Sequence, residues 1–472
     1  MPNVILLIDD NHSLDHVGCY GGHCATPTWD AVAAAGVRFT QLRTVSPVCS
    51  PARAALQTGC YPAQTGITHV LPSFPEDVDG DGARREPIQR TTLPAYFQRS
   101  GYECIYVGKW HVGDANVKAL YDRSAATDTA ARDYSRWCSE QGLPDGFIFN
   151  DPVRGKPFRY REAPHMSVPH TQPLDLPAEA EHNRWMLDHA LRLLAEHDLD
   201  QPLFFTFSTY GVHPPLAIPE PWYSMYDPAD MVMPDNWGPG KSEPPFLGDS
   251  YFRRLFHDVG DDFDLWRKAQ AVSLGYATYI DHLFGEFLDA CRSRGVLDDA
   301  VVVMTSDHGE MLGRHGLWQK FCPYEEALRV PWVMSAPGIP AGDVCTLDVS
   351  TVDVPATLLA AAGVTADAIE GEDLLPYVLQ QKAAPIVRDC FSEHSRPPTW
   401  RSWHDVPDWR CLVRRPWKYI LHSSGDEELY HLVDDPGEQD NMAGDVGTPQ
   451  QELRMALEQW MNQTGAAFTD HA

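Results

Sequence analysis

The stretch Val4-Ile5-Leu6-Leu7-Ile8-Asp9-Asp10 opens the chain with five consecutive aliphatic residues and ends in two carboxylates. A short continuous apolar run is typical of a strand that is buried on both faces of a parallel sheet. Open sheets of that kind place their functional sites at the carboxyl ends of the strands. The stretch therefore predicts a central strand that carries Asp9 and Asp10 to the functional edge of a sheet.

Four more apolar runs have the same character and alternate with helical patterns. The runs cover residues 102–107, 203–207, 301–305 and 330–334. The helical patterns cover residues 28–35, 92–100, 178–196, 265–292 and 354–362. This alternation is typical of units that build a parallel sheet with helices on both faces. We therefore predict the α/β class, with one large, mixed but mostly parallel sheet that is sandwiched by helices.

The pattern changes after about residue 370. Short strands are predicted over residues 409–413, 417–421 and 428–432, and a terminal helix over residues 449–461. We predict that residues 1–370 form the large α/β domain and that residues 371–472 form a smaller C-terminal α+β subdomain with a short antiparallel sheet. The segments at 72–91 and 214–250 are rich in Pro, Gly and charged residues, and we expect them to form loops over the site.

The charge balance excludes two classes of partner. The chain has 37 Lys and Arg against 66 Asp and Glu, which gives a formal net charge of −29. Nucleic acids and anionic membrane surfaces both need a basic footprint, so we expect the protein to bind neither. If the substrate is an anion, the protein has to build a local positive pocket against its own field.

Several features favour a cytoplasmic location. No apolar run approaches the ~20 residues that span a bilayer, and the N-terminus lacks the basic region and cleavage site of a signal peptide. The 11 cysteines have irregular spacings without a Cys-x-x-Cys pair, which does not indicate a disulfide framework. A periplasmic or secreted form stays open if the N-terminus was trimmed from a longer precursor.

The sequence Cys49-Ser50-Pro51-Ala52-Arg53 is the first candidate for chemistry. Pro51 suits the first position of a helix and Gly59 suits the position just after its end, so Cys49 is expected at a helix N-terminus. Free N–H groups and the helix dipole favour negative charge there, and Arg53 lies one turn further on. An ordinary buried thiol beside a surface arginine is the alternative that this motif alone leaves open.

A second candidate combines two strand ends. Thr305-Ser306-Asp307-His308-Gly309-Glu310 follows the predicted strand at 301–305 directly. Asp9, Asp10, Asp307 and His308 together would supply mostly oxygen ligands and one imidazole. Such a set suits Ca²⁺, Mg²⁺ or Mn²⁺ better than a structural zinc ion. Two carboxylates at a strand end more often cap a turn, so the site depends on the convergence of these four residues.

Four further residues with basic or protonatable side chains follow predicted strands or lie in loops. Lys109 and His111 lie in Gly108-Lys109-Trp110-His111, and an extended chain would turn both side chains to the same side. His213 follows the run at 203–207, and Lys320 lies beyond the Asp307 motif. Each of them taken alone is more often structural, but together they could form the positive pocket that an anionic substrate requires.

Taken as a set, these motifs resemble the sulfatase family, in the formylglycine-dependent branch of the alkaline phosphatase superfamily that also contains phosphonate monoester hydrolases. The resemblance runs from Pro2 to at least Asn441. Its motifs occur in the order of the family: Asp9-Asp10, Cys-x-Pro-x-Arg at residues 49–53 with a Leu-x-Thr-Gly tail, Gly-Lys-Trp-His at 108–111, Asp-His-Gly-Glu at 307–310, and Glu428-Leu429-Tyr430 followed by Asp435-Pro436-Gly437-Glu438.

The resemblance implies an alkaline-phosphatase-like catalytic domain that hydrolyses small anionic sulfate esters, in the manner of an arylsulfatase. It implies that a formylglycine-generating enzyme oxidises Cys49 to formylglycine, whose hydrate is the nucleophile. It implies one divalent ion, Ca²⁺ or Mn²⁺, held by Asp9, Asp10, Cys49, Asp307 and His308. The other implied catalytic residues are Arg53 and Lys109 for the hydrate and substrate oxygens, His111 as base, and His213 and Lys320 for the sulfate and the leaving group. The family also permits homo-oligomers.

Two departures from the common pattern widen the choice of substrate. Ala52 stands where many sulfatases have Ser, and His308 stands where many have Asn. Both favour the alternative of a phosphonate monoester or phosphodiester hydrolase with the same site. A remote alternative is a non-catalytic family member that acts as a binding protein, but no implied residue is missing. A phosphatase relative with a Ser or Thr nucleophile and two metals would need more His and Asp ligands than the motifs provide.

Overall fold

The computed structural model covers the whole chain and describes residues 1–71, 88–127, 130–146, 148–151, 156–159, 171–238, 262–385, 387–396 and 407–468. Among these residues, one mixed sheet of eight strands forms the centre of the molecule. In spatial order its strands are β13 (Asp343–Cys345), β2 (Val37–Phe39), β12 (Trp332–Ser335), β11 (Val301–Ser306), β1 (Val4–Asp9), β9 (Leu203–Ser208), β4 (Glu103–Gly108) and β5 (Arg123–Ala125).

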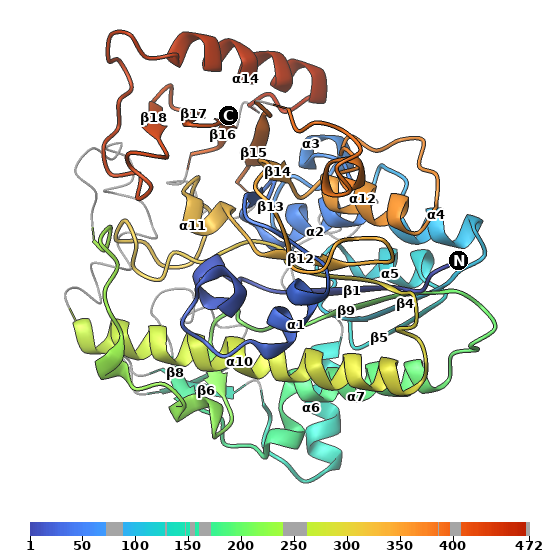
Figure 1. Cartoon of the computed structure of the whole chain (residues 1–472). Coiled ribbons are helices and arrows are strands. Elements are labelled where there is room, and N and C mark those ends of the chain that lie inside the picture. Colours follow the sequence, from blue (N-terminus) through green and yellow to red (C-terminus); the bar gives the residue numbers. More distant parts are fainter. Residues whose placement is uncertain are drawn as a thin grey trace.

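The predicted sheet and its helices are confirmed. Helices cover both faces of the sheet, as Figure 1 shows. One layer contains α1 (Pro27–Ala35), α7 (His182–Ala195) and α10 (Phe263–Ser293), and the other contains α2 (Cys49–Thr58), α4 (Leu93–Arg99) and α12 (Asp353–Ala361). Shorter helices are α3 (Pro62–Thr65), α5 (Asp114–Leu120), α6 (Ala130–Glu140), α11 (Glu325–Leu328) and α13 (Leu375–Val378).

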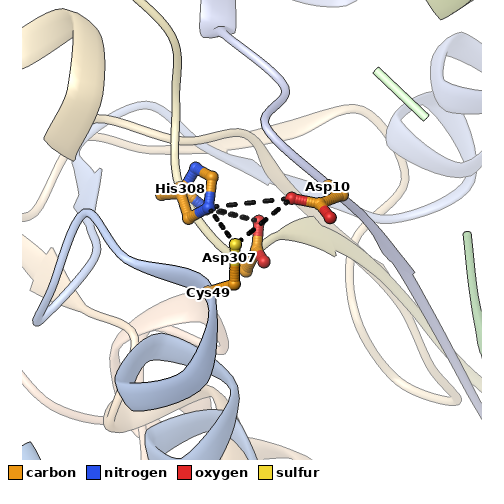
Figure 2. Close-up of side chains that lie close together, drawn as sticks. All are labelled: Asp10, Cys49, Asp307 and His308. Carbon is orange, nitrogen blue, oxygen red and sulfur yellow. Dashed lines mark hydrogen bonds and ion pairs between the residues drawn. The ribbon is translucent and has the colours of Figure 1, made fainter. Parts of the chain in front are cut away.

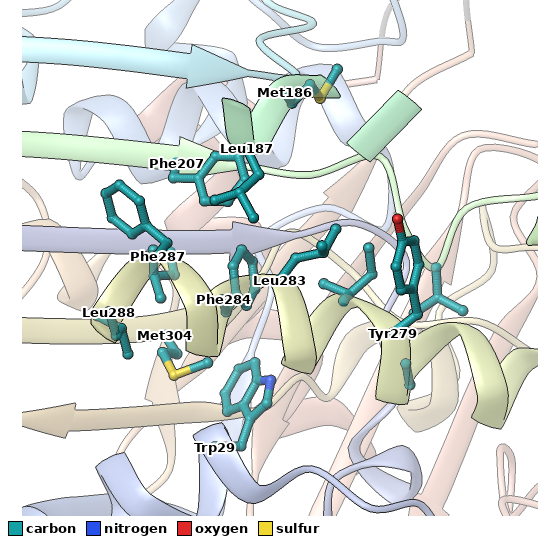
Figure 3. Packing of buried hydrophobic residues seen from close by; sticks show 14 of the residues in the cluster. Trp29, Met186, Leu187, Phe207, Tyr279, Leu283, Phe284, Phe287, Leu288 and Met304 are labelled. Carbon is teal, nitrogen blue, oxygen red and sulfur yellow. The ribbon is translucent and has the colours of Figure 1, made fainter. Parts of the chain in front are cut away.

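The strand period of two explains why β1 is apolar throughout. Ile5 and Leu7 pack into the cluster under α10, whereas Leu6 and Ile8 pack into the cluster under α2 and α12. Figure 3 shows the first of these clusters, in which aromatic side chains of α10 lie against the sheet. Every residue of β1 is buried, which fixes the register and direction of the strand.

One strand differs from the expectation of parallel pairing. The run at 330–334 forms β12, which is antiparallel to both β11 and β2. After β11 the chain stays at the carboxyl edge and re-enters the sheet from that edge, so β12 must run in the opposite direction. The neighbours of β1 are β11 and β9, and both pairings are parallel as expected.

The C-terminal strands form a separate antiparallel sheet. Its strands are, in order, β15 (Cys390–His394), β16 (Trp409–Arg414), β17 (Trp417–His422) and β18 (Glu427–His431), and α14 (Gln450–Thr464) packs on one face. The meander and the terminal helix were predicted, whereas β15 was missed. The other face contacts the loops around Phe321 and Tyr324 of the large sheet. The boundary near residue 370 stays a prediction.

The structure describes only parts of the two predicted loops at 72–91 and 214–250. Residues 72–87 and 239–261 lie outside the described residues. The described part of the segment at 214–250 contains a short strand, β10 (Leu216–Ile218), which pairs with β8 (Thr171–Pro173), and two 3₁₀ helices (Trp222–Ser224 and Pro228–Asp230). Small paired strands elsewhere are β3 (Leu42–Arg43) with β14 (Val349–Ser350), and β6 (Ile148–Asp151) with β7 (Lys156–Arg159). Among the described helices, none is long and apolar enough to cross a membrane.

Candidate active site

The parallel pairing of β1 with β11 brings two of the predicted motifs together. Asp9 is the register partner of Ser306, so Asp10 and Asp307 leave the sheet side by side. Asp10, Cys49, Asp307 and His308 each place one ligand atom within 4.8 Å of the others, and all four are buried. Figure 2 shows them converging from β1, α2 and β11. We call these four residues the acid–thiol group. Within it, His308 Nε2 lies 3.1 Å from Cys49 Sγ and 3.6 Å from an oxygen of each aspartate.

Cys49 lies at the start of a helix, as predicted, but the position of Pro51 was wrong. Helix α2 begins at Cys49 itself, so Pro51 is its third residue and not its first. Proline is tolerated there because the N–H groups of the first turn have no partner within the helix. Gly59 ends the helix in the left-handed region, with φ of +66°, as its place in the sequence suggested.

Asp9 lies beside the acid–thiol group but outside it. Its Oδ2 contacts the Nδ1 atom of His12, and its Oδ1 is buried without a hydrogen-bond partner among the described residues. Burial raises the pKa of Asp9 above its usual value. A buried carboxylate oxygen without a partner is costly unless a cation or a donor compensates it. The role of Asp9 as a metal ligand stays a prediction.

The residues present fit a divalent cation. Two aspartates of the acid–thiol group supply hard oxygen ligands and His308 supplies one imidazole, a combination that Mn²⁺ and Ca²⁺ can both use. Burial lowers the pKa of His308 to about 3, so its imidazole is neutral and able to ligate. The unpartnered Oδ1 of Asp9 provides a further oxygen at the same strand end.

Arg53 and Lys109 place two positive charges against the acid–thiol group. The Nε atom of Arg53 donates to Asp307 Oδ2 at 2.8 Å, and its Nη1 donates to Ser208 Oγ at 2.7 Å. Lys109 Nζ contacts Asp10 Oδ2 and lies 3.6 Å from Cys49 Sγ. Burial acts to raise the pKa of Asp307, but Arg53, together with smaller contributions from its other neighbours, holds it below its usual value.

The Cys49 thiol is protonated near neutral pH. Burial raises its pKa to about 11, although Lys320 and Arg53 oppose this shift. The thiolate is the reactive form of cysteine, and reactive cysteines have a lowered pKa. An unmodified Cys49 is therefore a poor nucleophile in this environment.

His111 lies near these cations, but the expected extended geometry was wrong. The chain turns at Gly108, whose φ is +100°, and His111 itself has φ of +54°. A side chain at 108 would collide with the Ser208 carbonyl oxygen, 1.7 Å from the ideal Cβ position, so the turn requires glycine. The Nε2 of His111 lies 2.8 Å from the Leu71 carbonyl oxygen. Burial, and then Lys109 and Arg53, hold the pKa of His111 well below its usual value, so it is neutral.

Lys320 is a buried cation whose Nζ has no hydrogen-bond partner among the described residues. Its two neighbours, Gln319 and Phe321, both have left-handed φ values of 72° and 80°. The Phe321 carbonyl oxygen accepts a 2.9 Å hydrogen bond from Trp409 Nε1 of the C-terminal sheet. The C-terminal sheet thus holds the loop that presents Lys320 to the site.

His213 lies on the other side of Tyr210. The backbone N–H of His213 donates to the Tyr210 carbonyl at 3.0 Å, and the Tyr210 ring centre lies 5.2 Å from Lys109 Nζ. His213 and Tyr210 both line a small cavity. His213 is thus joined to the acid–thiol group through Tyr210 and Lys109.

Sequence reasoning missed three residues that support the site. Ser208 and Tyr106 bond to Arg53 and to the Lys109 carbonyl, and Trp409 holds the loop of Lys320. Ser208 follows the predicted strand at 203–207 directly, which was a usable signal. The other two have no local signal, because their contacts join segments that are distant in the sequence.

A helix-covered α/β sheet thus carries carboxylates, a histidine and a helix-start cysteine at its carboxyl edge, where open sheets of this kind place their functional sites. Comparison with known families specifies the assignment. The family model described as Sulfatase matches residues 2–364, so the chain belongs to the sulfatase family. A second model, described as N-sulphoglucosamine sulphohydrolase, C-terminal, matches residues 313–466.

Known relatives agree with this assignment at low sequence identity. A protein named sulfatase from Formosa agariphila is 24% identical over 94% of this chain and 83% of its own length. An arylsulfatase from Clostridium perfringens is 25% identical over 93% of this chain and 90% of its own. The solved structure of a phosphonate monoester hydrolase from Silicibacter pomeroyi has a TM-score of 0.78 at 21% identity, and covers 100% of this chain and 96% of its own. That structural likeness shows the fold.

Proposed function

We propose that the protein is a sulfuric ester hydrolase of the arylsulfatase type, which uses a formylglycine derived from Cys49 and one divalent ion, Ca²⁺ or Mn²⁺. The observation that carries the proposal is the surrounding of Cys49. Its Sγ lies among two aspartates and a histidine, with Lys109 Nζ at 3.6 Å. Residue 49 thus lies between carboxylates that can hold a metal ion and a lysine that can bind an anion. This arrangement suits a nucleophile that attacks an anionic ester.

Oxidation of Cys49 would replace the protonated thiol, which is a poor nucleophile, by a more reactive group. A formylglycine-generating enzyme would convert the thiol to an aldehyde during maturation, and the hydrated aldehyde offers an oxygen nucleophile. A divalent ion bound by Asp10, Asp307 and His308, with Asp9 next to them, supplies Lewis-acid chemistry that lowers the pKa of a hydroxyl. Lys109 and Arg53 stabilise the negative charge that remains on residue 49.

The remaining residues have separate tasks in the proposal. His111, a buried imidazole beside Lys109 and Arg53, would serve as the general base for residue 49. Lys320, whose ammonium has no hydrogen-bond partner among the described residues, binds the sulfate oxygens. His213, which lines a small cavity together with Tyr210, would deliver a proton to the departing oxygen. These cations provide the local positive pocket that an acidic protein needs for an anionic substrate.

A second candidate function is hydrolysis of phosphonate monoesters or phosphodiesters at the same site. The observation in its favour is His308, whose Nε2 lies 3.1 Å from Cys49 Sγ where many sulfatases have an asparagine. An imidazole ligand favours Mn²⁺, which suits transfer of phosphorus esters as well as sulfate esters. Homo-oligomer formation and a cytoplasmic location stay predictions.

Parallel rate measurements separate the two functions. We expect a higher kcat/KM for 4-nitrophenyl sulfate than for a 4-nitrophenyl phosphonate monoester, because the chain belongs to the sulfatase family. Both esters carry one negative charge, so the comparison reports the choice of sulfur or phosphorus and not of charge. The measurement uses protein co-expressed with a formylglycine-generating enzyme and loaded with Mn²⁺ or Ca²⁺. Faster hydrolysis of the phosphonate would reverse the order of the two candidates, and hydrolysis of neither would reject both.

A further inference from the structure

A small cavity lies next to the proposed leaving-group acid. It is lined by His213 and by the rings of Tyr134, His182, Tyr210 and Tyr276, with the carboxylate of Glu181 beside them. Its volume is about 40 Å³, which corresponds to about three waters at ~10–15 Å³ each. A compact group therefore fits the cavity. Nothing in the proposed chemistry of residue 49 accounts for this collection of rings.

The position of the cavity suits the organic part of an ester. Tyr210 contributes its ring to the lining, and the centre of that ring lies 5.2 Å from Lys109 Nζ. Lys109 Nζ in turn lies 3.6 Å from Cys49 Sγ. The cavity is thus separated from the nucleophile by one lysine head and one ring.

The rings that line the cavity lie close together, and the faces of such rings carry negative electrostatic potential. The centres of His182 and Tyr134 are 4.8 Å apart, and those of His182 and Tyr210 are 5.0 Å apart, in tilted pairs. Burial lowers the pKa of His182 to about 3, so its ring carries no charge. Convergent neutral rings bind cations through the negative faces of their π systems, and they bind alkylammonium groups in particular.

Glu181 adds a carboxylate whose acceptor positions are mostly filled. Its Oε2 accepts from the N–H of Asn183 at 2.7 Å, the N–H of Arg184 at 3.0 Å and the hydroxyl of Tyr279 at 3.0 Å. Its Oε1 accepts from Asn183 Nδ2 at 2.8 Å and keeps about one acceptor position. When ionised, such a group attracts a cation through its field.

We infer that the cavity binds a small alkylammonium group, with quaternary ammonium as the best fit, on the alcohol side of the ester. The inference rests on the proposed function, because it names the substrate class of that same site. A quaternary ammonium has no N–H to donate, so it needs no acceptor, and its methyl groups pack on the rings. A primary ammonium has three N–H donors, whereas Glu181 Oε1 keeps about one acceptor position.

Binding to a variant that cannot turn over tests this inference separately from catalysis. We expect the Cys49→Ala variant to bind choline O-sulfate about tenfold more tightly than 3,3-dimethylbutyl sulfate, its uncharged isostere, by calorimetry. The two esters share shape and sulfate group, so a difference reports the cation alone. Equal binding, tighter binding of the neutral ester, or no binding of either would overturn the inference.

A matched pair of variants identifies the ring faces as the cause. Tyr134 has no assigned role in catalysis, and its hydroxyl donates to the Ala180 carbonyl at 2.7 Å. Tyr134→Phe removes the hydroxyl and keeps the face, whereas Tyr134→Leu removes both. In the Cys49→Ala background we expect the Phe variant to keep the preference for the cation and the Leu variant to lose most of it, with melting temperatures recorded for both. An unchanged preference in a folded Leu variant would contradict the ring-face explanation.

Turnover by the unsubstituted protein distinguishes the two levels of the proposal. Hydrolysis of 4-nitrophenyl sulfate without any preference for choline O-sulfate over the isostere rejects the ammonium cavity and leaves the sulfatase function standing. A preference in binding together with no hydrolysis of any sulfate ester rejects the proposed function and leaves the cavity standing.

Discussion

Replacement of Cys49 by alanine is expected to lower kcat for an aryl sulfate by at least ~10⁴-fold, the order of effect seen when a covalent nucleophile is removed. The loss follows because Cys49 Sγ is the atom that lies among the ligand atoms of Asp10, Asp307 and His308. Cys49 is buried at the helix start, so loss of its small side chain should shift the melting temperature by only a few degrees. Steady-state kinetics and a thermal melt on the same preparation check both parts.

Cys60 offers a matched control for this substitution. It is also a buried cysteine, but its Sγ contacts the carbonyl oxygens of Thr58 and Ala368 and not the acid–thiol group. The Cys60→Ala variant should therefore keep its rate while losing a comparable thiol. Retention of full activity by Cys49→Ala, with Cys60→Ala as reference, would exclude residue 49 as the nucleophile.

Removal of divalent metal is expected to abolish activity and also to lower the melting temperature. Without a cation, the buried carboxylates of Asp9 and Asp10 lose a compensating charge, and Asp9 Oδ1 has no hydrogen-bond partner among the described residues. A ligand at 100 times its Kd stabilises the folded state by about 2.7 kcal/mol, which is a shift of several degrees. Treatment with a chelator, dialysis and re-addition of Mn²⁺ or Ca²⁺, followed by thermal melts and kinetics, measures both effects.

The melting temperature separates ion binding from catalysis. Asp10→Asn keeps the shape of a ligand but removes its charge, so the rise in melting temperature on adding Mn²⁺ should largely disappear. Asp30→Asn makes the same change on the exposed side of α1 and should keep the rise. A melting temperature that no divalent ion alters in the unsubstituted protein contradicts the metal site.

Five strands of the central sheet, β1, β4, β9, β11 and β12, were predictable because each is mostly apolar and buried. The three-residue strands β2, β5 and β13 were not predicted. Val4 to Ile8 could not be mistaken for an amphipathic element, and the parallel pairing with β11 then forced Asp10 and Asp307 together. The direction of β12 was not predictable, because it depends on the path of the chain after Asp307 and not on the strand itself. The strand pattern of β15 is short, and its pairing with β16 spans a segment that the local sequence does not define.

The site was predictable to the extent that its residues follow strands or begin helices. Cys49, Lys109 and His308 all lie at such positions, and the chemistry of their side chains indicated a role in the site. The left-handed turn at Gly108 and His111 was not predicted, because it is required by the approach of the Ser208 carbonyl from another strand. The same limit applies to Trp409 and to the rings around Glu181, whose contacts cross between distant segments.

Mass spectrometry of the tryptic peptide from Thr44 to Arg53, combined with activity measurements on the same samples, tests the conversion of Cys49 most directly. Preparations made with increasing amounts of a formylglycine-generating enzyme should carry an increasing fraction of aldehyde at residue 49. We expect the rate of sulfate ester hydrolysis to rise in proportion to that fraction and to extrapolate to zero where only the thiol is present. Full activity in a preparation whose residue 49 is entirely thiol would contradict this chemistry.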